Sequence, residues 1–130
     1  MGDEYIECRA SDIVEGLIRD GRDDEIVVLL YMSRKEAVLF SDISLALGNG
    51  KYYASSKKTL SVIDMLMGME LVRKITVHYY RKEIKAYILT ECGLRVAGKL
   101  SALFGLQQKP KNIEEGFLPL QTASRGGGQE

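Results

Sequence analysis

Basic side chains are concentrated in one part of this 130-residue chain, with hydroxyl and aromatic side chains among them. Residues 51–85 contain eight Lys or Arg against three Asp or Glu, whereas residues 1–50 contain five against eleven. Lysine and arginine donate hydrogen bonds to phosphate oxygens and to guanine, and serine donates to either kind of group. Although the whole chain has no net charge, this local group of donors is typical of a surface that binds a polyanion such as nucleic acid.

The first part of the basic segment, ASSKKTLSVIDMLMGMELVRK at residues 54–74, has the apolar spacing of an amphipathic helix. A serine at position 55 or 56 suits its N-cap, and we expect the helix to end near Gly68 or Met69. The face that we expect to be buried consists of Thr59, Val62, Ile63, Leu66 and Met69. The residues outside this face are Lys57, Lys58, Leu60, Ser61 and Asp64.

The second part, LVRKITVHYYRKEIKAYILT at residues 71–90, changes to the period-two alternation of β-strands. Apolar residues occupy every second position on both sides of its middle, at Ile75, Val77, Ile84, Ala86 and Ile88. The polar YYRKE between the two runs is expected to form the tip of a β-hairpin. The basic residues at or beside this tip are Arg81, Lys82 and Lys85.

Four other helices and a short strand must position these two segments. Three helices are expected to begin at the N-cap signals Ser11-Asp12, Ser41-Asp42 and Thr90-Glu91. The fourth, in residues 22–34, is apolar nearly all round and should be central to the core. EAVLF, residues 36–40, is short and β-prone. The apolar positions expected in the last helix are Leu94, Val96, Ala97, Leu100, Leu103 and Phe104.

This order predicts a helix-rich α+β domain. We expect an N-terminal lead-in and flanking helix in residues 1–21, the main domain in residues 22–104, and a tail in residues 105–130, which has two prolines and a Gly-rich end.

The order and the residues together resemble a winged helix-turn-helix DNA-binding domain. The patterns that carry the resemblance are LFSDISLALG at 39–48, TLSVIDMLMGMELVRK at 59–74 and AYILTECG at 86–93. Transcription regulators of the MarR, PadR and ArsR kinds share them. Glu70 is a departure, because the family usually has glycine there, and we expect the helix exit to take a conformation suited to a non-glycine residue. The loop GNGKYY, residues 48–53, is longer than the plain turn of the motif.

The resemblance implies a DNA-binding transcription regulator, most simply a dimeric repressor that reads a palindromic site with helix 55–69 and the wing 71–90. The helix would enter the major groove, and the wing tip would contact the backbone or the adjacent minor groove. The first and last helices would form a homodimer, unless the last helix folds back on its own core. The residues that would contact double-stranded DNA are Lys51, Tyr52, Ser56, Lys57, Lys58, Leu60, Ser61, Arg81, Lys82 and Lys85.

Other interpretations of these residues stay open. The same sequence pattern would arise from a helix whose lysine-bearing end is only solvated. It would also arise from a hairpin tip that is polar only because hairpin tips are generally polar. The acidic residues 1–50 favour a winged-helix domain that docks a protein partner. A third class is a DNA-organising or plasmid-partition protein, which binds DNA as a dimer and spreads along it.

We do not expect an enzyme, a metal site or a cofactor. His78 is the only histidine, and the glycine-rich stretches lack the spacing of a phosphate-binding loop. Cys8 and Cys92 belong to no ligand cluster, so we expect two reduced cysteines in a cytoplasmic protein. No apolar run approaches the roughly 18 residues of a membrane span, and the acidic N-terminus does not resemble a secretory signal.

Overall fold

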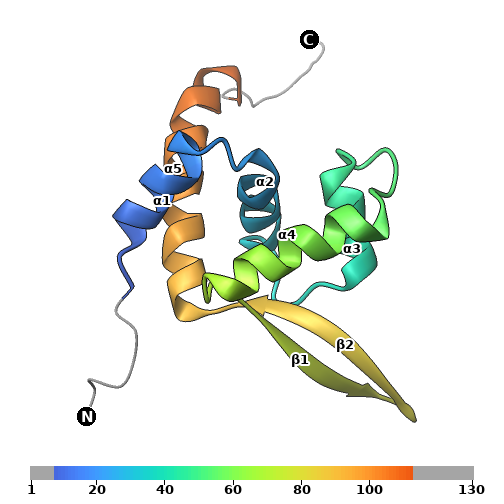
Figure 1. Cartoon of the computed structure of the whole chain (residues 1–130). Coiled ribbons are helices and arrows are strands. Elements are labelled where there is room, and N and C mark those ends of the chain that lie inside the picture. The colour runs from blue at the N-terminus through green and yellow to red at the C-terminus, as the bar shows by residue number, and fades with distance from the viewer. Residues whose placement is uncertain (1–7, 113–130) are drawn as a thin grey trace, which may run out of the picture. The chain divides into compact units, whose positions relative to one another are not determined.

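The structure, a computed structural model, describes residues 8–112 and contains within them five α-helices and one two-stranded antiparallel sheet (Figure 1). By their internal contacts, the described residues divide after Leu100 into two units. The order of elements is α1 (Ala10–Arg19), α2 (Asp23–Met32), α3 (Phe40–Leu47), α4 (Ser56–Gly68), β1 (Val72–Tyr79), β2 (Lys82–Leu89) and α5 (Glu91–Asn112). The expected α+β order is confirmed. The strand expected at residues 36–40 is a single bridge between Val38 and Tyr87.

Helix α2 lies at the centre of the first unit, as its nearly all-round apolar sequence predicts. It contacts α1, α3, α4 and β2, and Val28 and Leu29 are fully buried. The largest side chains that this core encloses are Leu29, Met32, Ile43, Ile63, Leu66, Leu71 and Leu100. The short helices α3 and α4 are therefore held by packing against α2 rather than by their own helical propensity.

The N-cap predictions are correct for two helices. Ser55 caps α4, because its Oγ accepts a hydrogen bond from the Lys58 backbone N–H at 3.1 Å. Thr90 does the same for α5, accepting from the Gly93 N–H at 3.0 Å.

The N-cap predictions for Ser11-Asp12 and Ser41-Asp42 are wrong. Helix α1 begins at Ala10 and α3 at Phe40, so both polar pairs lie inside the first turn. In α3 the carboxylate of Asp42 reaches back and accepts from the Leu39 N–H at 2.9 Å. An acidic residue at this inner position satisfies a free N–H at the helix start and suits the helix dipole, which the sequence pattern does not distinguish from an N-cap.

Helix α5 differs from expectation in its length and in which of its residues form the buried face. It continues to Asn112, past the expected end at Phe104. Gly105 does not end the helix, since a glycine inside a helix costs only about 1 kcal/mol. Leu94 and Leu103 were expected on the apolar face, but both are exposed. Val96, Ala97 and Leu100 are fully buried as expected.

The expectation for Glu70 is also wrong. This residue has φ +63°, the left-handed conformation that glycine usually provides at a helix exit. The surrounding hydrogen bonds hold it there: the Glu70 carbonyl accepts from Thr90 Oγ1 at 2.7 Å, and the Leu71 N–H donates to the Leu66 carbonyl at 3.0 Å. Glutamate is thus held here in a conformation that glycine usually provides.

The two cysteines are not separate reduced thiols as expected. Cys8 and Cys92 form a disulfide with a Cα–Cα distance of 5.5 Å across a sequence separation of 84 residues. The bond joins the residues just before α1 to the first turn of α5. The argument for a cytoplasmic location from reduced cysteines is therefore lost. Among the described residues, no helix is long and apolar enough to cross a membrane.

Candidate nucleic-acid interface

Helix α4 has one buried and one exposed side, as its spacing predicts. Thr59, Val62, Ile63 and Leu66 are buried, and Met69 is half-buried at the C-cap. The exposed residues of α4 that we predicted as contacts are Ser56, Lys57, Lys58, Leu60 and Ser61. Within residues 8–112, Lys57 forms no ion pair. Its ammonium group is therefore available to a ligand.

Lys58 is less available than the sequence suggested. Its Nζ lies 3.6 Å from Oδ2 of Asp24, in the first turn of α2. Lys58 and Ser61 also border a cleft of about 440 Å³ whose other walls carry Asp20, Asp23, Asp24 and Glu25. The acidic half of the sequence thus folds directly beside the basic helix. An anion that approaches this side of α4 meets carboxylates as well as Lys58.

The turn between α3 and α4 is clamped by Ser44. Its buried hydroxyl donates to the Ala54 carbonyl at 2.7 Å, and the Ala54 N–H donates to the Ser44 carbonyl at 3.0 Å. A side chain at Gly48 would collide with the Tyr52 carbonyl, so the turn folds back closely on the end of α3. The side chains of the turn that this arrangement leaves exposed are Lys51, Tyr52 and Tyr53.

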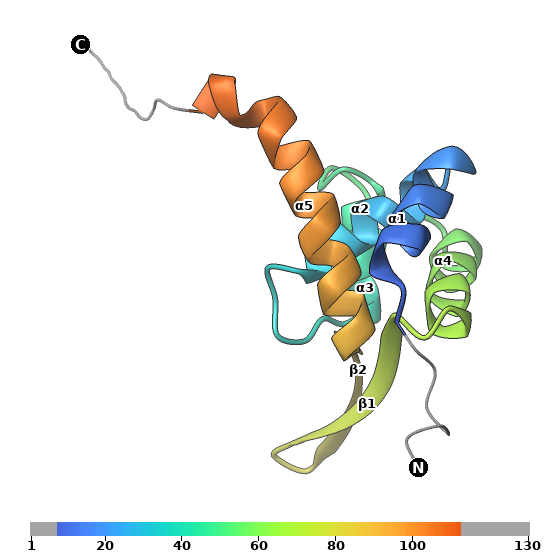
Figure 2. The same ribbon diagram turned by 90° about the vertical axis from the view of Figure 1, so that its left-hand side faces the viewer.

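The wing is the hairpin of β1 and β2, whose pairing runs from Val72↔Leu89 at its base to Tyr79↔Lys82 at its tip. Both views show it extending away from the helices (Figure 1, Figure 2). Arg81 and Lys82 are exposed at the tip. Lys85 lies further down β2, where its Nζ donates to Oγ1 of the cross-strand Thr76 at 3.0 Å. The predicted basic wing residues are therefore all on the surface, but Lys85 is not at the tip.

A hydrogen-bonded joint connects α4, the wing and α5. The Thr90 N–H donates to the Leu71 carbonyl at 3.0 Å, and the Thr90 hydroxyl bonds to both Glu70 and Gly93. The wing starts and ends at this joint. Its direction relative to α4 is therefore set by backbone contacts and not by the basic side chains themselves.

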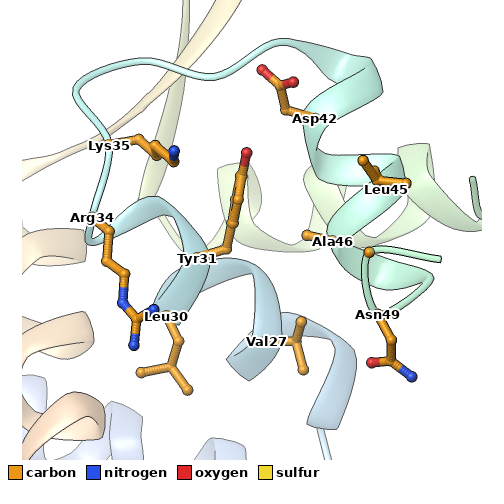
Figure 3. A pocket seen from close by; sticks show the side chains of 10 residues that line it. Val27, Leu30, Tyr31, Arg34, Lys35, Asp42, Leu45, Ala46 and Asn49 are labelled. Atoms are coloured by element: carbon orange, nitrogen blue, oxygen red, sulfur yellow. The ribbon is translucent and has the colours of Figure 1, made fainter. Parts of the chain in front are cut away.

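A cavity of about 500 Å³ between α2 and α3 was not predicted from the sequence (Figure 3). Val27, Leu30, Leu45 and Ala46 contribute apolar walls, and Tyr31 stands in its middle. Burial, and then the negative charge of Asp42, raise the pKa of the Tyr31 hydroxyl. The charged side chains around the cavity are Arg34, Lys35 and Asp42.

An apolar cavity with a few polar groups has the chemistry of a small-molecule site. No local pattern marks it, because residues from two helices form its walls. The sequence gives one indication of the cavity. Helix α2 is apolar nearly all round, so that Val27 and Leu30 are apolar although other faces of the helix are buried in the core.

No protein-family model matches this sequence, and no curated protein matches it. Solved structures do match. The adhesin competence repressor AdcR from Streptococcus pyogenes aligns with 84% of this chain and 80% of its own, at 12% identity and a TM-score of 0.57. ZitR from Lactococcus lactis aligns over the same shares, at 12% identity and a TM-score of 0.56. A PadR-like transcription factor from Bacteroides fragilis aligns with 77% of this chain and 96% of its own, at 23% identity and a TM-score of 0.51.

These similarities cover the helices and the hairpin together, and the order of elements agrees with the pattern read from the sequence. At such identities they establish the architecture. The chain has a winged helix-turn-helix fold, with one helix before the motif and a long helix after it.

Proposed function

We propose that this protein is a DNA-binding transcription regulator that reads duplex DNA with α4 and the wing. The observation that carries the proposal is the placement of charge: the basic window of the sequence lies on the exposed side of α4, on the turn before it and on the wing, whereas the other side of α4 is buried. Cations on a helix and on an adjoining hairpin can contact the phosphates on both sides of one groove. The resemblance to AdcR and to the PadR-like factor supports this role.

We further propose a homodimer, formed through α1 and α5, that acts as a repressor at a palindromic site. Ile18 on α1 and Leu94 on α5 are about half exposed, at 47% and 56%. Exposed large apolar side chains on the two helices outside the motif are suited to a subunit interface. A two-fold axis there would present two α4 helices to two half-sites.

The test is fluorescence anisotropy with a labelled duplex from the region upstream of the gene, across a salt series. If Lys57 neutralises one phosphate, Lys57→Ala should weaken binding about fivefold at 0.15 M salt and about eightfold at 0.1 M, and lower the salt slope by about 0.9. Lys35→Ala is the matched control, because it removes an exposed lysine that follows α2 and lies outside both the proposed DNA surface and the proposed subunit interface. Equal losses in the two variants, or no binding to any duplex at low salt, would contradict the proposal.

A protein-interaction module is the second candidate, and the acidic cleft beside α4 favours it. A stable protein partner whose binding is unchanged by charge reversal at Lys57 and Lys58 would support that alternative. A DNA-organising protein would instead bind cooperatively, with an affinity that rises with the length of the duplex.

The pair between Lys58 and Asp24 gives a second prediction. Asp24→Asn should strengthen duplex binding about fivefold at 0.15 M salt, because Lys58 becomes free to neutralise one more phosphate and a nearby negative charge is lost. Fold stability should change by less than about 1 kcal/mol, since the pair is half-exposed. Glu36→Gln, in the loop between α2 and α3, is the control and should leave the affinity unchanged. An unaltered affinity in Asp24→Asn would show that Lys58 does not approach the DNA.

A further inference from the structure

The tip of the wing contains a tyrosine in a conformation that tyrosine rarely adopts. Because Tyr79 pairs with Lys82, the hairpin loop consists of Tyr80 and Arg81 alone. Tyr80 has φ +58°, and Arg81 is not among the positive-φ residues. Glycine is the usual residue at the first position of a two-residue loop of this kind, because side chains are disfavoured there. A bulky residue at this position therefore strains the backbone.

Within residues 8–112, no burial of the Tyr80 side chain offsets this strain. Tyr80 is 87% exposed, the most exposed large apolar or aromatic side chain in the described part of the chain. Within the described residues, the ring of Tyr80 contacts the ring of Tyr79, itself exposed, at 4.4 Å between centroids and an interplanar angle of 69°. Strained residues that the core does not require are characteristic of sites that contact a ligand. The observation therefore points to a partner outside the protein.

The neighbours of Tyr80 define the chemistry of that partner. Tyr79, Tyr80, Arg81 and Lys82 line one hollow at the tip. The nearest carboxylate along the chain is that of Glu83, which faces His78 in the strand register. Within residues 8–112, Glu83 forms no ion pair with the two tip cations. Two cations beside an exposed ring match a phosphate backbone next to an exposed base face, because every base can stack on an aromatic side chain.

We propose that Tyr80 is an aromatic wedge that enters the minor groove of bound duplex DNA and partly unstacks one base step, while Arg81 and Lys82 hold the flanking phosphates. Side chains that insert between base steps kink the duplex and let more protein surface contact it. The inference rests on the proposed function, since α4 must first place the wing against the duplex. It adds a contact that distorts the DNA, at a position where a polar tip alone would only touch the backbone.

The test uses a set of upstream duplexes, each with 2-aminopurine at one successive position, because the fluorescence of this base rises when it is unstacked. Wild-type protein should raise the fluorescence at least twofold at one step in the groove beside that occupied by α4. Tyr80→Phe should keep the signal, because the ring is retained. Tyr80→Gly should abolish it and weaken binding about tenfold.

Tyr80→Gly also separates a DNA role from a structural one. Glycine relieves the positive φ, so this variant should be at least as stable as the wild type in urea unfolding while it binds less tightly. Leu39→Ala, which removes an exposed apolar side chain from the segment before α3, away from α4, its preceding turn and the wing, should leave the 2-aminopurine signal unchanged.

The outcomes that overturn the wedge differ from those that overturn DNA binding. The wedge proposal is wrong if the wild type binds DNA in a manner sensitive to Lys57→Ala but 2-aminopurine fluorescence rises at no position. It is also wrong if Tyr80→Gly retains the fluorescence increase. In both cases the proposal of a DNA-binding regulator is unaffected. If no duplex binds at low salt, the proposed function fails and the wedge fails with it.

Discussion

Gly93→Ala is expected to lower the free energy of unfolding by about 3 kcal/mol or more, the range of a severe packing defect. A Cβ at this position would collide with the Leu71 carbonyl oxygen and would lie 3.2 Å from a methyl carbon of Leu89. The carbonyl cannot simply move away, because it accepts the Thr90 N–H at 3.0 Å in the joint between α4, the wing and α5. The added carbon must therefore displace either α5 or the base of the wing.

Gly98→Ala provides a control in the same helix. No atom lies within 4 Å of the Cβ that would be added there. This variant should be more stable by about 1 kcal/mol, since alanine favours the helix over glycine by that amount. Urea unfolding followed by circular dichroism measures both changes. Equal stabilities for the two variants would show that α5 does not approach Leu71 as closely as described.

Loss of the Cys8–Cys92 disulfide has the second large expected effect. The bond closes a loop over 84 residues of sequence separation, which includes α1 to α4 and the wing. By restricting the unfolded chain, a bond of this kind contributes about 2–4 kcal/mol, and the loop-entropy relation for this separation gives an upper value of about 4.6 kcal/mol. Cys8→Ser/Cys92→Ser should therefore lower the unfolding free energy by about 2–4 kcal/mol.

Treatment with a reductant provides the matched comparison. Dithiothreitol should lower the unfolding free energy of the wild type by the same amount, whereas it should not change that of the double-serine variant. Thiol labelling of the unfolded wild type without reductant should find no free cysteine among positions 8 and 92. Full labelling of both cysteines in the wild type would show that the disulfide is absent. The same conclusion would follow if the wild type unfolded at the same urea concentration with and without reductant.

The helices and the wing could be predicted from the sequence because their signals are local. The alternation of residues 71–90 predicted a hairpin, and the buried stripe of α4 was predicted at Thr59, Val62, Ile63 and Leu66. Each signal joins residues that are two to four positions apart on one strand or helix, so the geometry of the element itself decides which side chains share a face. The exposure of the predicted basic residues follows from the same geometry.

Contacts between distant segments were decided by the tertiary structure. The pairing of Cys8 with Cys92, the approach of Asp24 to Lys58, and the left-handed turn at Glu70 all depend on where separate elements meet. The same is true of the cavity between α2 and α3. Residue types and their spacing along the chain determined which elements form in this protein and which of their faces are apolar. Packing brings together groups that are tens of residues apart. It alone decided that the two cysteines pair, which lysine is held by a carboxylate, and which residue the fold must hold in a strained conformation.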